Sequence, residues 1–287
     1  MPILVSALLW GTTGTAASFA PAGAPAAGIG AAALALGGAL LFLTDRAASA
    51  LPRVCGVGER WLLLVGAVAV VGYPVTFYPA VTRTGVAVST VIALGSAPVF
   101  TGLLGWLARQ GRPSGRWAGA TALAVLGCGV LVLGPELVGE GGAAVDPLGL
   151  LLAALSGLSY AVYSLIAGRL IAAGHPSGGV MGAMFGGAAV LVLPVLLAGP
   201  TGWLLSVRGA GVVLHLGVIT TFLAYRLFGH GLRHTSAQTA TTLTLAEPAV
   251  AAVLGVAALG ERLPTVSWCG LAVLAGGLAV LTIPGRR

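Results

Sequence analysis

Long apolar runs, separated by short polar turns, follow one another along the whole chain. Each run holds roughly 18 to 23 residues, which is about the length that a helix needs to cross the hydrocarbon core of a bilayer. The strands of a membrane barrel would instead alternate apolar and polar residues over about ten positions. The pattern therefore predicts ten transmembrane helices, at residues 2–20, 26–44, 61–80, 86–107, 117–134, 148–168, 179–198, 210–229, 237–259 and 266–283.

The composition places these helices in a membrane. Hydrophobic residues make up 57% of the chain and charged residues 7%, which is too little polar surface to cover a water-soluble globule of this length. No positively charged residue precedes the first run, so we interpret it as a span and not as a cleaved signal peptide. The predicted fold class is an all-α integral membrane protein that is surrounded by lipid.

The chain also matches itself at a spacing of 150 residues, so that residues 1–135 and 147–287 are two copies joined by a connection at 136–146. Each copy contains five predicted spans. An odd number makes the second copy enter the membrane from the opposite side, as in the inverted repeats of secondary transporters. Because Ala, Gly, Leu and Val match by chance, the comparison depends on uncommon residues: Trp10 with Tyr160, Tyr78 with Phe228, Arg83 with Arg233, Pro98 with Pro248, and Arg112 with Arg262.

The 14 basic residues are all arginines, and their placement predicts the orientation. If the N-terminus is cytoplasmic, ten of them lie on the cytoplasmic side and three on the outer side, while Arg226 lies inside a span. Basic residues favour cytoplasmic loops. We therefore expect a multi-pass protein of the inner (plasma) membrane, with both termini in the cytoplasm and the acidic connection at 136–146 outside. The arginines form no continuous basic face, which argues against a nucleic-acid partner.

Several short motifs stand out, namely Leu9-Trp10-Gly11, the small-residue-proline elements around Pro98 and Pro248, Leu245-Ala246-Glu247-Pro248, and Leu259-Gly260-Glu261. Together they resemble the EamA-like branch of the drug/metabolite transporter superfamily, and the resemblance covers essentially the whole chain. It implies a ten-helix membrane transporter. One departure is that the first half has Gln110-Gly111 where the second half has Gly260-Glu261, so the acidic signature at the helix end occurs once.

Two ionisable residues inside predicted spans mark a candidate site. A charged side chain at the centre of a membrane helix costs roughly 2.5–3.5 kcal/mol, so Glu247 and Arg226 should face a cavity or each other. In a cavity, Glu247 is a ligand for a substrate amine or a group that exchanges protons, and Arg226 is a partner for a substrate carboxylate. The alternatives are that Glu247 serves only as a partner of Arg226 or of free backbone donors, and that the long Arg226 side chain extends to the membrane surface.

Proline, aromatic and polar residues complete the candidate site. Pro98 and Pro248 match between the copies and are candidate gating positions, because each proline removes a helix hydrogen bond. The alternative is that they are ordinary transmembrane prolines. The proposed cavity walls are Trp10, Tyr160 and Tyr163, unless these aromatic residues serve only in packing. Gln238, Thr241 and Thr244 share a helix face with Glu247 and are candidate lining residues, unless the threonines bond their own backbone.

The sequence contains no arrangement that is typical of an enzyme or of a nucleotide-binding protein, so we expect neither catalysis nor a cofactor. The three cysteines lie in different segments, and the spacing of His215, His230 and His234 is unlike that of a metal site, so no metal is predicted either.

The prediction is a secondary transporter that exports small metabolites such as amino acids by alternating access between the two inverted repeats. One alternative is a proton-coupled exporter of cationic drugs, and another is a membrane scaffold or sensor that transports nothing. The expected partners are lipids and a small-molecule substrate, with protons and a second copy of the chain as further candidates.

Overall fold

The computed structural model describes residues 2–109, 111–138, 146–259 and 263–282, and within them every regular element is a helix. This confirms the predicted all-α fold class. The first half contains α1 (Pro2–Ala17), α2 (Ala26–Leu43), α3 (Arg46–Val54), α4 (Val57–Leu107) and α5 (Gly115–Val138). The second half contains α6 (Pro147–Ala172), α7 (Ser177–Ala198), η1 (Gly202–Leu205), α8 (Val207–Leu214), η2 (His215–Leu223), α9 (Ala224–Gly231), α10 (Ala237–Leu243), α11 (Ala246–Leu259) and α12 (Thr265–Thr282).

Most helix bounds agree with the apolar runs to within a few residues. Eight spans among the described residues are long and apolar enough to cross a membrane, and α1 is a shorter apolar helix. The total of ten spans stays a prediction. The sequence pattern missed α3, a short helix between α2 and α4 that is too polar for a span. The Asp45 side chain begins it by accepting a hydrogen bond from the Ala47 N–H at 3.0 Å.

The 51-residue α4 contains both the third and the fourth predicted spans, with a turn between them at Gly85. Gly85 has φ 79°, which glycine adopts without strain. Both arms of α4 pack along α6. On the first arm, the backbone carbonyl of Tyr73 accepts a hydrogen bond from the Ser156 hydroxyl of α6, and on the second arm Ala93 contacts Gly157 of α6. Since both arms pass the same part of α6, the chain reverses direction at Gly85, as two antiparallel spans require.

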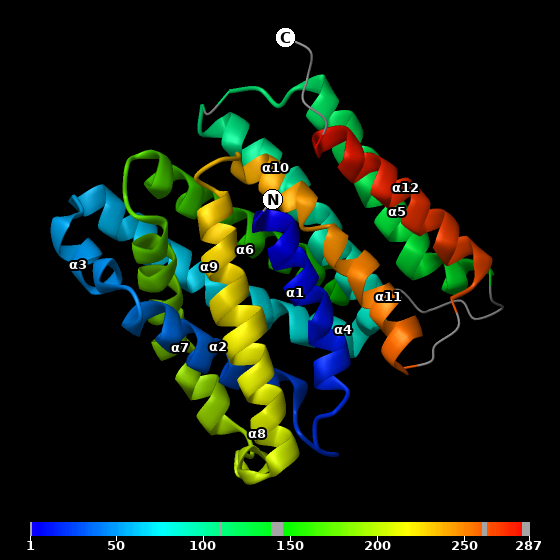
Figure 1. Cartoon of the computed structure of the whole chain (residues 1–287), viewed down its shortest axis with the longest axis horizontal. Helices are drawn as coiled ribbons and strands as arrows, with labels where there is room; N and C mark the ends of the chain where they lie inside the picture. Colours follow the sequence, from blue (N-terminus) through cyan, green and yellow to red (C-terminus); the bar gives the residue numbers. More distant parts are fainter. Residues whose placement is uncertain (1, 110, 139–145, 260–262, 283–287) are drawn as a thin grey trace.

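At one edge of the bundle, α5 and α12 lie side by side (Figure 1). Glycines allow their backbones to touch. A Cβ on Gly127 would lie 2.6 Å from the Leu274 Cα, and a Cβ on Gly270 would lie 2.7 Å from the Leu131 Cα. Close approach through small residues is the usual packing of helices in lipid, where burial of apolar surface gives no net gain.

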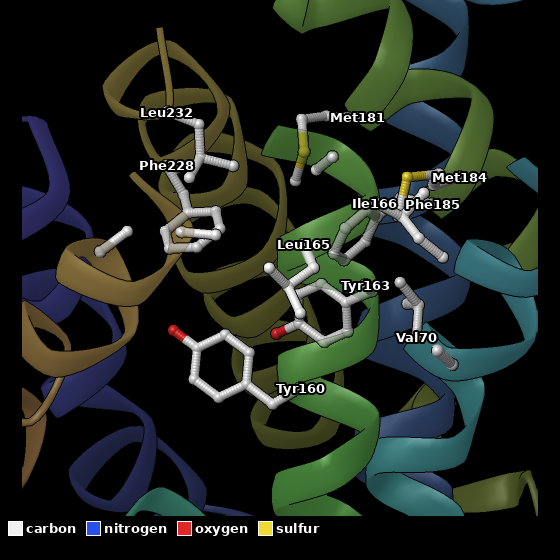
Figure 2. Close-up of a cluster of buried hydrophobic side chains, with 14 of the residues drawn as sticks. Val70, Tyr160, Tyr163, Leu165, Ile166, Met181, Met184, Phe185, Phe228 and Leu232 are labelled. Carbon is white, nitrogen blue, oxygen red and sulfur yellow. The ribbon is translucent and has the colours of Figure 1, made fainter. Parts of the chain in front are cut away.

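Between α6, α7 and α9 the bundle is filled at one end, whereas its other end is hollow. We call the end that holds the start of α1 and the end of α12 the terminal end, and the opposite end the Gly85 end. Large apolar side chains fill the terminal half. Figure 2 shows Phe228 of α9 and Leu232, which follows α9, packed opposite Leu165 of α6 and Met181 of α7.

An ion pair between Arg83 and Asp146 joins the two halves at the Gly85 end. The Arg83 guanidinium donates to one Asp146 oxygen at 2.9 Å, and the other oxygen accepts from the Leu148 N–H at 2.9 Å at the start of α6. The hydrogen bond from Arg83, followed by the backbone bond, holds the pKa of Asp146 below its usual range. Such a group adds stability above its usual pKa of about 4 and loses that contribution as the pH falls through the lower, folded-state pKa.

We therefore expect Asp146→Asn to unfold at a lower temperature than the unmodified protein at neutral pH. The difference should shrink as the pH falls below about 4, because the native carboxylate is then protonated too. Thermal unfolding of both proteins in detergent across this pH range checks the prediction. A difference that stays constant with pH would show that the charge of Asp146 contributes nothing.

Candidate substrate cavity

A cavity of about 860 Å³ occupies the Gly85 half of the bundle. Its walls come from both halves of the chain, including α1, both arms of α4, α6, η2 and α11. Val86, at the turn of α4, and Leu263, just before α12, lie at the end towards the Gly85 turn. On the terminal side of Tyr160, large apolar side chains fill the space between α6, α7 and α9. The cavity is therefore closed towards the terminal end.

Aromatic rings form most of the deep wall. Trp10 of α1 packs edge-on to Tyr160 of α6, with ring centroids 6.4 Å apart, and against Tyr225 of α9 at 4.8 Å. Tyr160 and Tyr163 are neighbours on α6, with centroids 5.1 Å apart (Figure 2). The further aromatic residues that line the cavity are Tyr73, Phe77, Tyr78 and Phe185. The three aromatic residues predicted from the sequence thus lie together on the cavity wall.

Hydrogen bonds hold these rings in place. The Trp10 indole donates to the Thr220 carbonyl oxygen at 2.8 Å, and the Tyr160 hydroxyl donates to Thr244 Oγ1 at 2.8 Å. Thr220 belongs to η2, a π-helix in the middle of the eighth predicted span. π-helical stretches shift the backbone register, and they occur frequently at functional sites. Here the stretch places a carbonyl oxygen where the Trp10 N–H reaches it.

The hydrogen bond of Trp10 gives a prediction about stability. We expect Trp10→Phe to lower the free energy of unfolding by about 1–2 kcal/mol, because the ring remains but the buried Thr220 carbonyl loses its donor. Trp61→Phe is the matched control: Trp61 is 62% exposed, and its substitution should change stability by less than about 0.5 kcal/mol. Chemical unfolding in detergent measures both. Equal losses in the two variants would contradict the role of the indole N–H.

Glu247 lies at a break between two helices. The expected span at 237–259 is interrupted where α10 ends at Leu243 and α11 begins at Ala246, and this break places Glu247 in the first turn of α11. A carboxylate is favoured there, because the first N–H groups of a helix are free and the helix dipole is positive. Glu247 lines the cavity. In the part of the chain that the structure describes, no ion pair reaches its carboxylate.

The break also changes the interpretation of Pro248. Since Pro248 follows in the first turn of α11, it begins a helix and does not kink a continuous one. It lines the cavity, whereas its repeat partner Pro98 is buried in the second arm of α4 and is not among the cavity residues. The two prolines therefore occupy different surroundings, although the sequence aligns them.

Arg226 lies apart from Glu247 and from the cavity. Its side chain is exposed, with the guanidinium donating to Thr44 Oγ1 at 3.3 Å and lying 5.9 Å from the centre of the Phe222 ring. Thr44 follows α2 at the terminal end. This placement corresponds to the alternative in which the long side chain extends to the membrane surface, and it provides no cation for a substrate carboxylate.

The three polar residues ahead of Glu247 do not share one cavity face. The amide of Gln238 lies against Gly105, and the Thr241 hydroxyl bonds the Ala237 carbonyl of its own helix at 3.0 Å. Only Thr244 reaches the wall, through Tyr160. The helical spacing that placed them with Glu247 ends at Leu243, where α10 stops.

Sequence reasoning missed Tyr225, Phe185 and Thr220 as wall residues. Tyr225 donates to or accepts from the Tyr163 hydroxyl at 3.1 Å, and Phe185 packs on Tyr225 with centroids 4.2 Å apart. Nothing in the repeat pattern marks them. The pairing of Trp10 with Tyr160 was the available signal, since the copies place these residues at equivalent positions and the structure brings their rings together.

Comparisons with known proteins agree with this architecture. A model of the EamA-like transporter family matches residues 1–133 and 147–283. An uncharacterized transporter of Bacillus subtilis, YwfM, is 38% identical over 288 residues, which cover 99% of this chain and 94% of that protein. An uncharacterized transporter of Clostridium kluyveri is 29% identical over 136 residues, covering 47% of this chain and 44% of that protein. A solved crystal structure of 23% identity superposes with a TM-score of 0.77, covering 98% of this chain and 95% of that one, and shares the fold.

Apolar helices around a central cavity, together with these relatives, define a multi-pass membrane transporter that sits in lipid and handles small molecules. The relatives indicate a transporter rather than an enzyme, and a bacterial family of this kind is consistent with the inner membrane. The chain belongs to the EamA-like transporter family.

Proposed function

We propose that the protein transports small organic cations, by alternating access between its two halves. The observation that carries the proposal is the chemistry of the cavity wall. Among the described residues that line it, Glu247 is the only carboxylate, and none of them is an arginine or a histidine. A carboxylate and aromatic faces attract a cation, since the ring face carries partial negative charge. The wall therefore favours a cationic substrate, which was the alternative in the sequence analysis, over an amino acid.

An amino acid fits the cavity less well. The expected zwitterion site needed Arg226 to bind the substrate carboxylate, but its guanidinium lies beside Thr44 and not beside Glu247. A substrate carboxylate in the cavity would meet the tyrosine hydroxyls and a second carboxyl group, that of Glu247. Burying a charge without an opposite partner is costly.

Export in exchange for protons is part of the proposal. Glu247 would hold a proton in one half of the cycle and the cation in the other, so that the two ligands compete for one carboxylate. The wall leaves Glu247 free for this exchange, because no ion pair engages it in the described part of the chain.

Binding of a matched pair of compounds tests the substrate class. Benzyltrimethylammonium and neopentylbenzene have nearly the same shape, but only the first is charged. We expect the cation to bind to purified protein at least about tenfold more tightly, as a desolvated cation–π contact and a carboxylate provide. Leucine and glutamate should bind more weakly than the cation. Equal affinity for benzyltrimethylammonium and neopentylbenzene, or preferred binding of an amino acid, would reject the proposal.

Transport in proteoliposomes tests the direction and the coupling. An imposed proton gradient should drive labelled benzyltrimethylammonium against its own gradient, and collapse of the proton gradient with an ionophore should stop it. Movement that only follows the gradient of the cation would indicate a facilitator and would reject proton exchange.

A further inference from the structure

Three potential metal ligands from both halves of the chain meet at the terminal end. They are Cys55, which follows α3, Glu59, in the first turn of α4, and His175, which follows α6. His175 Nε2 lies 3.0 Å from Glu59 Oε1 and 3.9 Å from Cys55 Sγ, and the three ligand atoms all lie within 4.8 Å of one another. We call these residues the Cys-Glu-His cluster. It is far from the cavity and takes no part in the proposed transport site.

The backbone at each residue of the cluster is fixed by hydrogen bonds. Gly174, with φ 100°, ends α6, and the His175 N–H bonds the Leu170 carbonyl at 3.2 Å while the Gly174 N–H bonds that of Ile171 at 3.0 Å. This is the Schellman arrangement, which fixes the direction in which the chain leaves a helix. It places the His175 ring over the link between α3 and α4.

The other two ligands are held by the start of α4. The Cys55 carbonyl accepts from Arg60 Nε at 3.0 Å, and the Cys55 N–H bonds the Leu51 carbonyl at 3.0 Å. Glu59 uses one carboxylate oxygen to accept from the Gly56 N–H at 3.2 Å, which leaves the other oxygen directed at His175. The cluster is therefore positioned by local structure on both sides.

The donor set and its spacing select the kind of metal. Zinc binds thiolate at about 2.3 Å and imidazole or carboxylate at about 2.0–2.2 Å, so neighbouring ligands in a tetrahedral site lie roughly 3.3–3.6 Å apart. The observed 3.0 and 3.9 Å fall on either side of that range. Sulfur and nitrogen donors disfavour magnesium and calcium, which prefer oxygen ligands.

The cluster combines a buried thiol with an approach from water. Cys55 is 2% exposed, whereas the side chains of His175 and Glu59 are 19% and 34% exposed. A metal ion needs such an entry path. Three protein ligands in a tetrahedral site leave a fourth position for water.

We propose that the Cys-Glu-His cluster binds a zinc-class divalent ion through Cys55 Sγ, a Glu59 oxygen and His175 Nε2. The ion bridges the link before α4, in the first half of the chain, to the turn after α6, in the second half. A second contact lies in the neighbouring segments, where Asp45, at the start of α3, packs against Gly178, in the first turn of α7. The bound ion therefore braces the terminal end, which is the closed end of the cavity.

Metal titration of the purified full chain tests the site without any transport measurement. Cobalt(II) reports thiolate ligation through a charge-transfer absorption band, and zinc affinity is measured by competition with a coloured chelator. We expect one equivalent of cobalt to give the thiolate band and zinc to displace it. The double variant Cys128→Ser with Cys269→Ser, which retains Cys55 as its only cysteine, should keep both the band and the zinc affinity.

Single substitutions within the cluster should instead remove or weaken metal binding. Cys55→Ser should abolish the thiolate band, and both Cys55→Ser and His175→Gln should weaken zinc binding by more than about 100-fold, since even the partners of metal ligands contribute 10- to 100-fold. Gel filtration shows whether each variant remains folded. Absence of the band in the double cysteine variant, or unchanged zinc affinity in folded Cys55→Ser, would overturn the proposal and leave a hydrogen-bonded cluster without a metal. A cation-binding defect in Glu247 variants has no bearing on either result.

Discussion

Glu247→Gln is expected to abolish tight binding of organic cations while the protein remains folded. Glutamine has nearly the same shape but no charge, and removal of one partner from a desolvated charge pair costs about 2–5 kcal/mol. The lower value corresponds to a loss of affinity of about 30-fold. Calorimetric titration with benzyltrimethylammonium measures it, and gel filtration of the variant checks that the fold is intact.

Arg226→Gln is the matched control for Glu247→Gln. It also removes a charge from within a predicted span, but Arg226 is exposed beside Thr44 and away from the cavity. We expect its affinity for the cation to stay within about twofold of that of the unmodified protein, since surface charges contribute little at a distance. If Arg226→Gln loses as much affinity as Glu247→Gln, the two residues act together and the wall described above is incomplete.

The same variants test proton exchange. A carboxylate that holds either a proton or the cation releases the proton when the cation binds. We therefore expect addition of benzyltrimethylammonium to a weakly buffered solution of the protein to acidify it, and Glu247→Gln to remove this signal. Cation binding without acidification would separate the substrate site from proton coupling.

Gly127→Ala is expected to have the largest effect on stability. A Cβ at this position would overlap the backbone of Leu274, so one of the two helix backbones has to shift. Overpacking of this kind costs roughly 1–3 kcal/mol, and a contact with backbone places the cost at the upper end. Unfolding in detergent, followed by circular dichroism, measures the loss.

Gly129→Ala is the control, two residues along the same helix. Nothing lies within 4 Å of a Cβ at Gly129. Its replacement should leave the free energy of unfolding unchanged or raise it by up to about 1 kcal/mol, because alanine favours a helix more than glycine does. Equal destabilisation by both substitutions would mean that helix propensity, and not the contact with α12, sets the requirement for glycine.

The fold was largely predictable, because a bilayer imposes one length and one kind of element on a spanning segment. The two arms of α4 lie where the third and fourth apolar runs were expected, and the turn falls at Gly85 between them. The break before Glu247 was not predicted. We expected one continuous span at 237–259, and the hydrogen bonds around Thr244 and Leu245 show that the helix stops there.

One residue of the candidate site was predictable from the cost of burying its side chain in a membrane. Glu247 was found because a carboxylate in a membrane is costly and must have a reason. Arg226 carried the same signal, yet its long side chain extends to Thr44 at the end of α2 and not into the cavity. The Cys-Glu-His cluster gave no signal at all, because His175 is 120 residues from Cys55 and only the packed fold brings them together.

The contact between α5 and α12 has a consequence for how the halves can move. α5 belongs to the first half of the chain and α12 to the second, and their backbones touch at Gly127 and Gly270. Helices in such contact cannot slide without a clash, so we expect this edge of the bundle to act as the hinge line of any rocking motion. Under the proposed alternating access, segments far from this edge, such as α2 and α7, would then travel the greatest distance (Figure 1).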